Sequence, residues 1–332
     1  MGIDVIYTNG VIAAREKYLL KDRIFKLCED SAQEAFRVLS ESGFGSGAAA
    51  ESAYDFENLV TAEERALDDF IREYAPSRAE AVYLLSPRDF HNAKALLKAK
   101  YLETDAEKML APEGLISVAE LKKCLENRNF FLLGKNLGGA LTKAEEILSA
   151  EDASGAAVGV LFEKALFAHL QETCGKNKVL KKLLTAKADM SNILTVFRSS
   201  DKENAEKAFV SGGKLNGEQL KKLFDGETAV LEKTPYAEFG KACFEAQEAG
   251  QPCTAAEKMR DSLEAEFFFE KRFEPEKNQP FLFYVFRRRM EIENVRIIFV
   301  CLLAGMKEQE IKKTQDKINH QHELMVQELE KV

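Results

Sequence analysis

The 332-residue chain has only four histidines, which is few for a catalytic or metal-binding protein. None of the four histidines stands in a recognisable nucleophile or metal motif. His320 and His322 are two positions apart, so on a helix they point to different faces and form a poor metal pair. The six cysteines are widely spaced and include no Cys-x-x-Cys pair for zinc or redox chemistry. The sequence therefore predicts no catalytic residue, no cofactor and no metal site.

Two glycine-rich stretches resemble phosphate-binding loops without meeting their requirements. Gly43 to Ala48 fits a Gly-x-Gly-x-x-Ala pattern, but a helical pattern precedes it where a dinucleotide site needs a strand. Gly213-Lys214 resembles the end of a P-loop, yet Ala208 replaces the first glycine and Leu215 replaces the closing Ser or Thr. Both stretches are predicted to be turns, so we expect no nucleotide chemistry.

The composition and charge of the chain limit the kinds of partner that it could bind. The chain is 31% charged and 45% hydrophobic with a net charge of -8, which is typical of a soluble, mildly acidic protein. Its basic clusters are short and flanked by acids, which argues against nucleic acid as a partner. No window reaches 18 apolar residues and no secretory leader is evident, so we expect a reducing cytosol and, at most, a peripheral membrane role.

A short polar pattern recurs three times along the chain. An acidic residue stands three positions before an asparagine, and an apolar-rich segment follows. The distance from the first asparagine to the second is 100 residues, and from the second to the third it is 102. A glycine-led element follows each copy, at Gly114, Gly213 and Gly305. Such regular self-similarity indicates repeated structural units. The motif residues are Asp89, Asn92, Lys94, Asp189, Asn192, Arg198, Glu291, Asn294 and Arg296.

These repeated residues are better explained by structure than by catalysis. A residue that recurs at one place in every repeat is more naturally a structural fixture than an active-site amide. A partly buried asparagine needs partners for its donors and acceptor, and the acid three positions earlier lies on the same helical face. The positions that follow, Lys94, Leu194 and Arg296, share no chemistry. This variation argues against a catalytic triplet.

The elements that position the motif are predicted to be helices throughout. We expect an all-α protein of three diverged helical repeats related by a pseudo-threefold axis, over residues 1–112, 113–214 and 215–332. Phe281 to Leu302 should form one helix, with the apolar run from Ile297 to Ala304 covered on all sides.

Local signals predict several helix boundaries. Tyr7 to Cys28 reads as one helix. Ser86 and Pro87 have the residue types of a helix start. Gly138-Gly139 should interrupt the helices around it, and a charged amphipathic helix should cover residues 307–331.

These motifs also support a resemblance to a known family. Glu291, Ile292, Asn294, Val295, Arg296, Ile297 and Ile298 match the late motif of the C subunits of the archaeal and bacterial V/A-type rotary ATPases, whose counterpart in the eukaryotic vacuolar enzyme is the d subunit. The segments around Asn92 and Asn192 are similar to its early and middle motifs. The resemblance extends from Tyr7 to about Lys317. Glu293 and Cys301-Leu302 depart from it, since the family usually has Arg and Gly-Lys there.

The resemblance implies a fold, a role and a set of partners. It implies a funnel of three units and a non-catalytic central-stalk subunit that couples a rotor axle to a membrane ion-translocating ring. The complex would support ATP-driven proton or sodium transport or ATP synthesis. The implied partners are the c/K-type proteolipid subunits of the ring and the D-type and F-type axle subunits, with the chain peripheral on the cytoplasmic side.

An alternative from another class is a cytosolic helical-repeat scaffold unrelated to any ATPase. A scaffold would also show repeated helices and no reactive site.

Under the ATPase hypothesis, docking on the membrane ring would involve polar contacts from the loops near Gly43 to Ser46, Gly138 to Gly139 and Gly212 to Gly213. Under either hypothesis no small-molecule substrate is expected.

Overall fold

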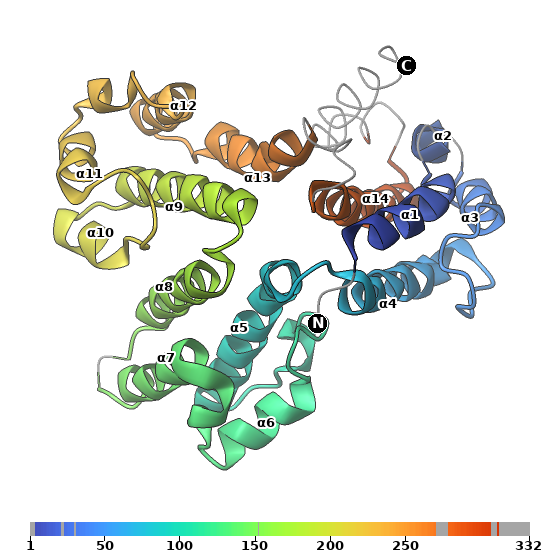
Figure 1. Cartoon of the computed structure of the whole chain (residues 1–332), viewed down its shortest axis with the longest axis horizontal. Coiled ribbons are helices and arrows are strands. Elements are labelled where there is room, and N and C mark those ends of the chain that lie inside the picture. Colours follow the sequence, from blue (N-terminus) through green and yellow to red (C-terminus); the bar gives the residue numbers. More distant parts are fainter. Residues whose placement is uncertain are drawn as a thin grey trace. The chain divides into compact units, whose positions relative to one another are not determined.

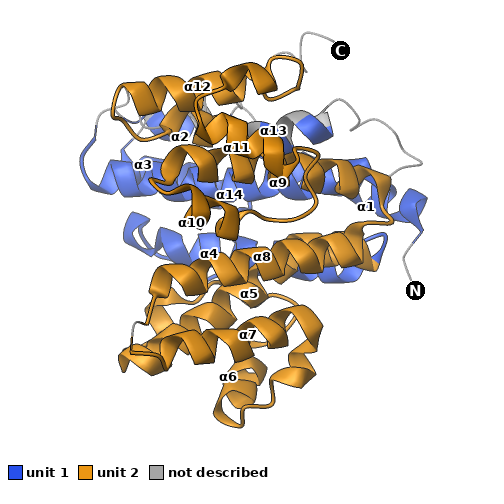
Figure 2. Cartoon of the chain, turned by 90° about the vertical axis from the view of Figure 1, so that its left-hand side faces the viewer, with its two compact units in different colours: residues 1–77, 263–332 blue, residues 78–262 orange. Residues whose placement is uncertain are grey.

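The computed structural model describes residues 4–20, 23–29, 31–151, 153–269, 278–306 and 311. Across these ranges the regular structure consists of α-helices and short 3₁₀ turns without a strand, as Figure 1 shows. The all-α prediction is therefore confirmed. The helices divide into two compact units, residues 1–77 with 263–332 and residues 78–262, coloured separately in Figure 2. The predicted division into three repeats near residues 112 and 214 stays a prediction.

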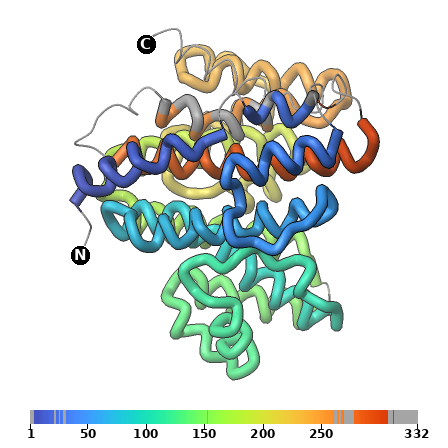
Figure 3. Tube along the Cα trace, turned by 90° about the vertical axis from the view of Figure 1, so that its right-hand side faces the viewer, coloured from blue at the N-terminus to red at the C-terminus, as the bar shows by residue number. Residues whose placement is uncertain are grey.

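The first unit combines helices from both ends of the chain around α14. In the tube view of Figure 3, α14 runs beside α1 and α4. Aromatic rings fill the space between α4 and α14: Phe70 stacks on Phe281 and Phe56 on Phe299, with ring centroids 5.7 and 5.2 Å apart. The elements of this unit are α1 (Val5–Arg15), η1 (Glu16–Tyr18), α2 (Arg23–Glu29), α3 (Ala32–Glu41), η2 (Ala53–Asp55), α4 (Phe56–Tyr74) and α14 (Gln279–Leu303).

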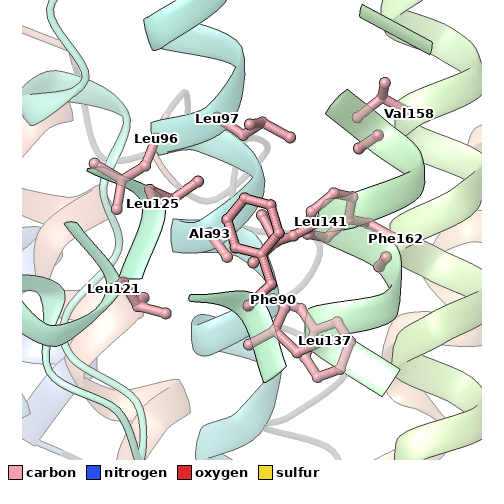
Figure 4. Close-up of a cluster of buried hydrophobic side chains, with 13 residues drawn as sticks. Phe90, Ala93, Leu96, Leu97, Leu121, Leu125, Leu137, Leu141, Val158 and Phe162 are labelled. Carbon is pink, nitrogen blue, oxygen red and sulfur yellow. The ribbon is translucent and has the colours of Figure 1, made fainter. Parts of the chain in front are cut away.

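The second unit is built on three long helices, α5, α8 and α9. An apolar cluster of this unit lies between α5, α6, α7 and α8, where Phe90, Leu141 and Phe162 meet (Figure 4). Its elements are α5 (Arg78–Leu102), η3 (Glu107–Met109), α6 (Val118–Glu126), η4 (Phe130–Leu133), α7 (Gly134–Leu148), α8 (Gly155–Cys174), α9 (Lys178–Arg198), α10 (Lys202–Ala208), α11 (Gly217–Phe224), η5 (Thr228–Leu231) and α12 (Ala237–Glu248). The range of α13 (Thr254–Phe269) spans the boundary between the two units.

Side-chain caps fix where the helices of the second unit begin. Ser154 accepts a hydrogen bond from the N–H of Ala157 at the start of α8. Asn216 and Gln219 form a reciprocal capping box at the start of α11. Each cap gives a partner to backbone N–H groups that have none within the helix, and is worth about 1 kcal/mol.

The single helix predicted from Tyr7 to Cys28 is wrong, because the chain breaks between α1 and α2. Leu19 has an extended backbone and, like Leu20, is buried. The N–H of Leu20 is donated to the side chain of Glu291 and is therefore used outside any helix. A long-range hydrogen bond and apolar burial together outweigh the local helical pattern.

The helix start predicted at Ser86 and Pro87 is also wrong. Helix α5 begins at Arg78, eight residues before Ser86, and Pro87 lies inside it. A proline there loses one backbone hydrogen bond and strains the preceding turn. Leu85 and Val82 on that turn are buried, so packing keeps this part of the chain helical.

The glycine pair at 138 and 139 does not interrupt a helix, because α7 runs through both positions. A Cβ on Gly138 would collide with the carbonyl oxygen of Phe130, so this glycine permits a close approach of the 3₁₀ turn η4. A Cβ on Gly139 would meet nothing within 4 Å. The prediction that these two residues lie in a loop is therefore wrong.

The predicted helix from Phe281 to Leu302 is confirmed by α14. Its apolar end is not covered all round by the described residues, since Val300 is 55% exposed. The helix predicted over residues 307–331 lies outside the described residues except for Ile311. His320 and His322 lie outside them as well.

We predict that a fragment of residues 78–262 folds on its own, because this unit is continuous in sequence and contains its own core. A fragment of residues 1–77 should fail to fold cooperatively, because α4 loses the apolar face of α14. Circular dichroism with thermal unfolding measures both. A cooperative transition in 1–77, or none in 78–262, would contradict the division into these units.

Candidate functional site

The three predicted acid and asparagine pairs lie on three long helices. Asp89 and Asn92 are on α5, Asp189 and Asn192 on α9, and Glu291 and Asn294 on α14, and all six side chains are buried. Buried polar groups need hydrogen-bond partners, so the partners of these side chains reveal their role.

On α5 the pair binds the backbone of the segment that leads into α6. Asp89 accepts hydrogen bonds from the N–H groups of Leu115 and Ile116 at 3.1 and 3.0 Å. Asn92 accepts from the N–H of Ala111 at 2.8 Å and donates to its carbonyl oxygen at 3.1 Å. We call this acid, this asparagine and the backbone that they bind an acid–asparagine anchor.

On α9 the pair makes the same set of bonds to the segment that leads into α11. Asp189 accepts from the N–H groups of Lys214 and Leu215 at 3.0 and 2.9 Å. Asn192 accepts from the N–H of Val210 at 2.8 Å and donates to its carbonyl oxygen at 3.0 Å. The two acid–asparagine anchors of the second unit therefore share the same four backbone hydrogen bonds.

The glycines that the sequence pattern placed after each motif explain part of this match. Gly114 directly precedes Leu115, and Gly213 directly precedes Lys214. A Cβ on either glycine would collide with a carboxylate oxygen, of Asp89 in one case and of Asp189 in the other. Only glycine allows the backbone to come this close to the acid.

On α14 the acid binds backbone from the other end of the chain. Glu291 accepts from the N–H of Leu20 at 2.8 Å. Leu20 lies three residues before the start of α2 at Arg23, as Leu115 lies three before α6 and Lys214 three before α11. The glycine-led element predicted after α14 includes residues 307–310, which lie outside the described residues.

Glu291 also belongs to a buried group of charges. Arg288 donates to Glu291 and to Glu63 of α4, both at 2.7 Å. The other oxygen of Glu63 accepts from the N–H of Gly45 at 2.8 Å, and the guanidinium of Arg288 lies 5.2 Å from the Phe44 ring centroid. Burial lowers the pKa of Arg288, but the two carboxylates raise it by more, so it stays charged. The Gly43 to Ser46 stretch is thus a turn held by a hydrogen bond to Glu63 and by the contact of Phe44 with Arg288.

The basic residues of the motif lie on three different helices, α5, α9 and α14. Lys94 is half-buried on α5. Arg198 pairs with Glu257 within the second unit. Arg296 bonds to Glu57 and Glu64 of α4 in the first unit, at 2.7 and 3.1 Å. The bond to Glu57 is the largest cause of the raised pKa of Arg296. Arg198 and Arg296 therefore make separate structural contacts.

Tyr236 is a contributor that the sequence did not reveal. Its hydroxyl donates to Asp189 at 2.8 Å, which gives this carboxylate a third donor. Burial and this hydrogen bond raise the pKa of Tyr236 above its usual value near 10. No short pattern links Tyr236 to Asp189, because 47 residues separate them.

The acid–asparagine anchors hold backbone segments in place and do not position catalytic groups. Among the described residues, no set of three or more His, Cys, Asp or Glu side chains is placed to hold a metal ion. Ser86 Oγ and His169 Nε2 are 3.4 Å apart, and burial lowers the pKa of His169 by more than the charge of Glu172 raises it, but none of the described hydrogen bonds joins this pair to an acid. None of the helices in the described ranges has the length and apolar content needed to span a membrane. These features define an all-helical protein in which recurring acid–asparagine anchors fix the loops.

Comparison with known proteins gives the family. The family model described as ATP synthase (C/AC39) subunit matches residues 8–314, and the chain belongs to this family. It is 26% identical over 278 residues to the C subunit of the V-type ATP synthase of Thermus thermophilus, covering 80% of this chain and 86% of that protein. It is 25% identical over 331 residues to the C subunit of the A-type ATP synthase of Pyrococcus furiosus, covering 92% and 88%.

We predict that Asn192→Ala lowers the free energy of unfolding by about 2–4 kcal/mol, since it leaves the buried N–H and carbonyl of Val210 without partners. Asn92→Ala should cost less, because its partner Ala111 is only half-buried and water can replace the amide. Urea denaturation measures both. The exposed Asn127→Ala is the control and should cost under about 1 kcal/mol. Equal effects at positions 192 and 127 would contradict the role of the anchor.

We predict that Tyr236→Phe costs about 1–3 kcal/mol near neutral pH through loss of its bond to Asp189. The raised pKa means that the folded state holds the phenolic proton more tightly than the unfolded state. The stabilisation is therefore complete below pH 10 and declines as the pH rises above 10. Denaturant titrations at several pH values should show the difference between wild type and variant shrinking above pH 10. Tyr54→Phe, at an 80% exposed residue, should show neither effect.

Proposed function

We propose that this chain is a non-catalytic central-stalk subunit of a V/A-type ATPase that couples the rotor axle to the membrane ion-translocating ring. The observation that supports this most is the family match over residues 8–314. The curated relatives, which are named as C subunits of V-type and A-type ATP synthases, align with most of the chain, and most of their own length is covered too. In this role the chain serves ATP-driven ion transport or ATP synthesis without reacting itself.

The acid–asparagine anchors suit such a mechanical part. A subunit that transmits torque must keep its loops fixed to its helices under lateral load, and it needs no reactive group. In the second unit each anchor ties a connecting segment to a long helix through four hydrogen bonds from buried side chains. Such bonds are costly to break, because each would leave a buried polar group without a partner. Loops held in this way form a preformed surface for docking.

Three related anchors also support the arrangement of three repeats as a funnel. The anchors on α5 and α9 share four backbone hydrogen bonds, and Glu291 on α14 binds the backbone at the corresponding position before α2. Because Leu20 comes from the start of the chain, the third copy is completed by the N-terminal segment. A funnel of three repeats would offer a wide end to the many subunits of the membrane ring and a socket to one axle.

The proposed partners are the c/K-type proteolipid ring and the D-type and F-type axle subunits, with the chain peripheral on the cytoplasmic side of the membrane. An interface that resists torque should bury well above about 1,000 Å². Exposed apolar side chains at turns would supply part of this area, and Phe131 and Leu132 of η4 are 77% and 61% exposed. Since contacts spread over several loops, single alanine substitutions should cost little binding.

The alternative of a cytosolic scaffold unrelated to an ATPase has no support from the family match. Both roles would use the same helical repeats, so the fold alone does not separate them. Association with other ATPase subunits does.

We predict that the tagged full-length chain, purified from its native membranes in mild detergent, brings ring and axle subunits with it. Mass spectrometry identifies the subunits, and an untagged strain is the control. The isolated chain should show no ATPase activity, because nucleotide chemistry would belong to other subunits. Recovery of the chain without any ring or axle subunit, or ATP hydrolysis by the isolated chain, would overturn the proposal.

A further inference from the structure

A groove of about 780 Å³ lies on the surface of the second unit. Helix α8 forms its floor and α7 forms one wall. The other wall consists of Lys207 in the last turn of α10 and residues 209–211 after that helix. Figure 2 shows α7, α8 and α10 on the side that faces the viewer. The acid–asparagine anchors do not bind the side chains of this groove. They share one residue with it, Val210, whose backbone binds Asn192.

The floor of the groove is an apolar helix face that the chain leaves partly uncovered. Helix α8 has few charged residues, and apolar side chains occur on all its faces. A helix of this kind is expected to be buried on every side. Along the groove, however, Val160, Leu161, Ala165 and Ala168 are only half-buried. Two of these four residues are alanines, so a second helix could approach α8 closely.

The rim of the groove is positive although the whole chain is acidic. Its lining includes Lys135 and Lys143 on α7, Lys164 on α8 and Lys207 on the second wall, and it includes no Asp or Glu. Lys164 donates to the carbonyl oxygen of Lys207, and the Lys207 ammonium pairs with Glu203, both at 2.7 Å. Lys135 and Lys143 make no ion pair with the residues that the structure describes. In a chain of net charge -8, such a cluster indicates an acidic ligand.

We propose that this groove binds an acidic amphipathic helix of a partner protein. The apolar face of that helix would pack on Leu161 and Ala165, and its carboxylates would reach the lysines on the two walls. From Lys135 to Lys143 the rise along α7 is about 12 Å, or two helical turns, which matches acids placed two turns apart on the partner. A free phosphate would leave the apolar floor uncovered, and a flat membrane surface would not enter between the walls. An amphipathic helix bound in the groove would both cover the apolar floor and pair with the lysines of the rim.

Two glycines provide a matched test of the groove. Gly139 on α7 lines it, whereas Gly159 on α8 does not, and a Cβ at either position meets nothing within 4 Å. Both lie inside a helix, where replacing glycine by leucine favours the helix. Gly139→Leu should therefore fill the groove without disturbing the fold, and Gly159→Leu is its control. Circular dichroism and thermal unfolding verify that both variants fold.

The experiment uses the full-length protein and a synthetic, fluorescently labelled helical peptide of about 15 residues with leucine and alanine on one face and glutamate on its flanks. A second peptide replaces every glutamate by glutamine. We expect saturable binding of the glutamate peptide by fluorescence anisotropy, weakened by salt because ion pairs contribute. Gly139→Leu and the double variant Lys135→Glu, Lys143→Glu should each weaken binding by about tenfold or more, and Gly159→Leu by less than about twofold.

Several outcomes would overturn the inference. These are the absence of saturable binding, equal affinity for the two peptides, and equal effects of the two leucine variants. Sedimentation with vesicles of anionic phospholipid is a further arm, and vesicle binding that the lysine reversals abolish, without peptide binding, would assign the groove to a membrane surface instead. Because the isolated chain is used, failure here leaves the proposed central-stalk role untouched, and that role is tested separately by purification from membranes.

Discussion

The structure depends on one constraint: a chain segment packed against a helix must find partners for the backbone N–H and carbonyl groups that it takes out of water. A long helix cannot supply them from its own backbone, whose groups are already paired. On α5 and α9 an acid and an asparagine, three residues apart on one face, supply them instead. The acid accepts from two successive N–H groups, and the asparagine pairs with both groups of a single residue. The pair thus fixes both the position and the direction of the segment.

Burying a carboxylate is costly unless hydrogen bonds or a positive charge offset the loss of hydration. The buried carboxylates of the two units are stabilised in different ways. Asp189 has three hydrogen-bond donors, two from the backbone and one from Tyr236. Glu291 instead pairs with the cation of Arg288, which Glu63 also contacts. Its longer side chain reaches Leu20 and Arg288 at the same time, which suits a position between α14 and the segment before α2.

Rigid loops and an incompletely covered helix explain how the chain could act in an assembly without chemistry. The acid–asparagine anchors hold the segments before α6 and α11 in one conformation, so a partner need not order them on binding. The groove over α8 differs, since its apolar floor and lysine rim suit a partner of defined character. Under the two proposals made above, both features would serve recognition of other proteins, and the chain belongs to a family of ATP synthase subunits.

The sequence by itself determined the all-helical class, the three positions of the acid and asparagine pairs, and the family to which their spacing pointed. These properties depend on side-chain types and helical periodicity, which are local. It also placed glycine before Leu115 and Lys214 without giving the reason, which is the approach of the acid carboxylates. The tertiary structure decided which groups each motif residue binds. Leu20 and Glu291 are 271 residues apart, and Tyr236 lies 47 residues from Asp189, so no local pattern connects them. It also kept Pro87 inside α5 and Gly139 inside α7, because burial and packing of neighbouring helices outweigh the small propensities by which a sequence marks helix ends.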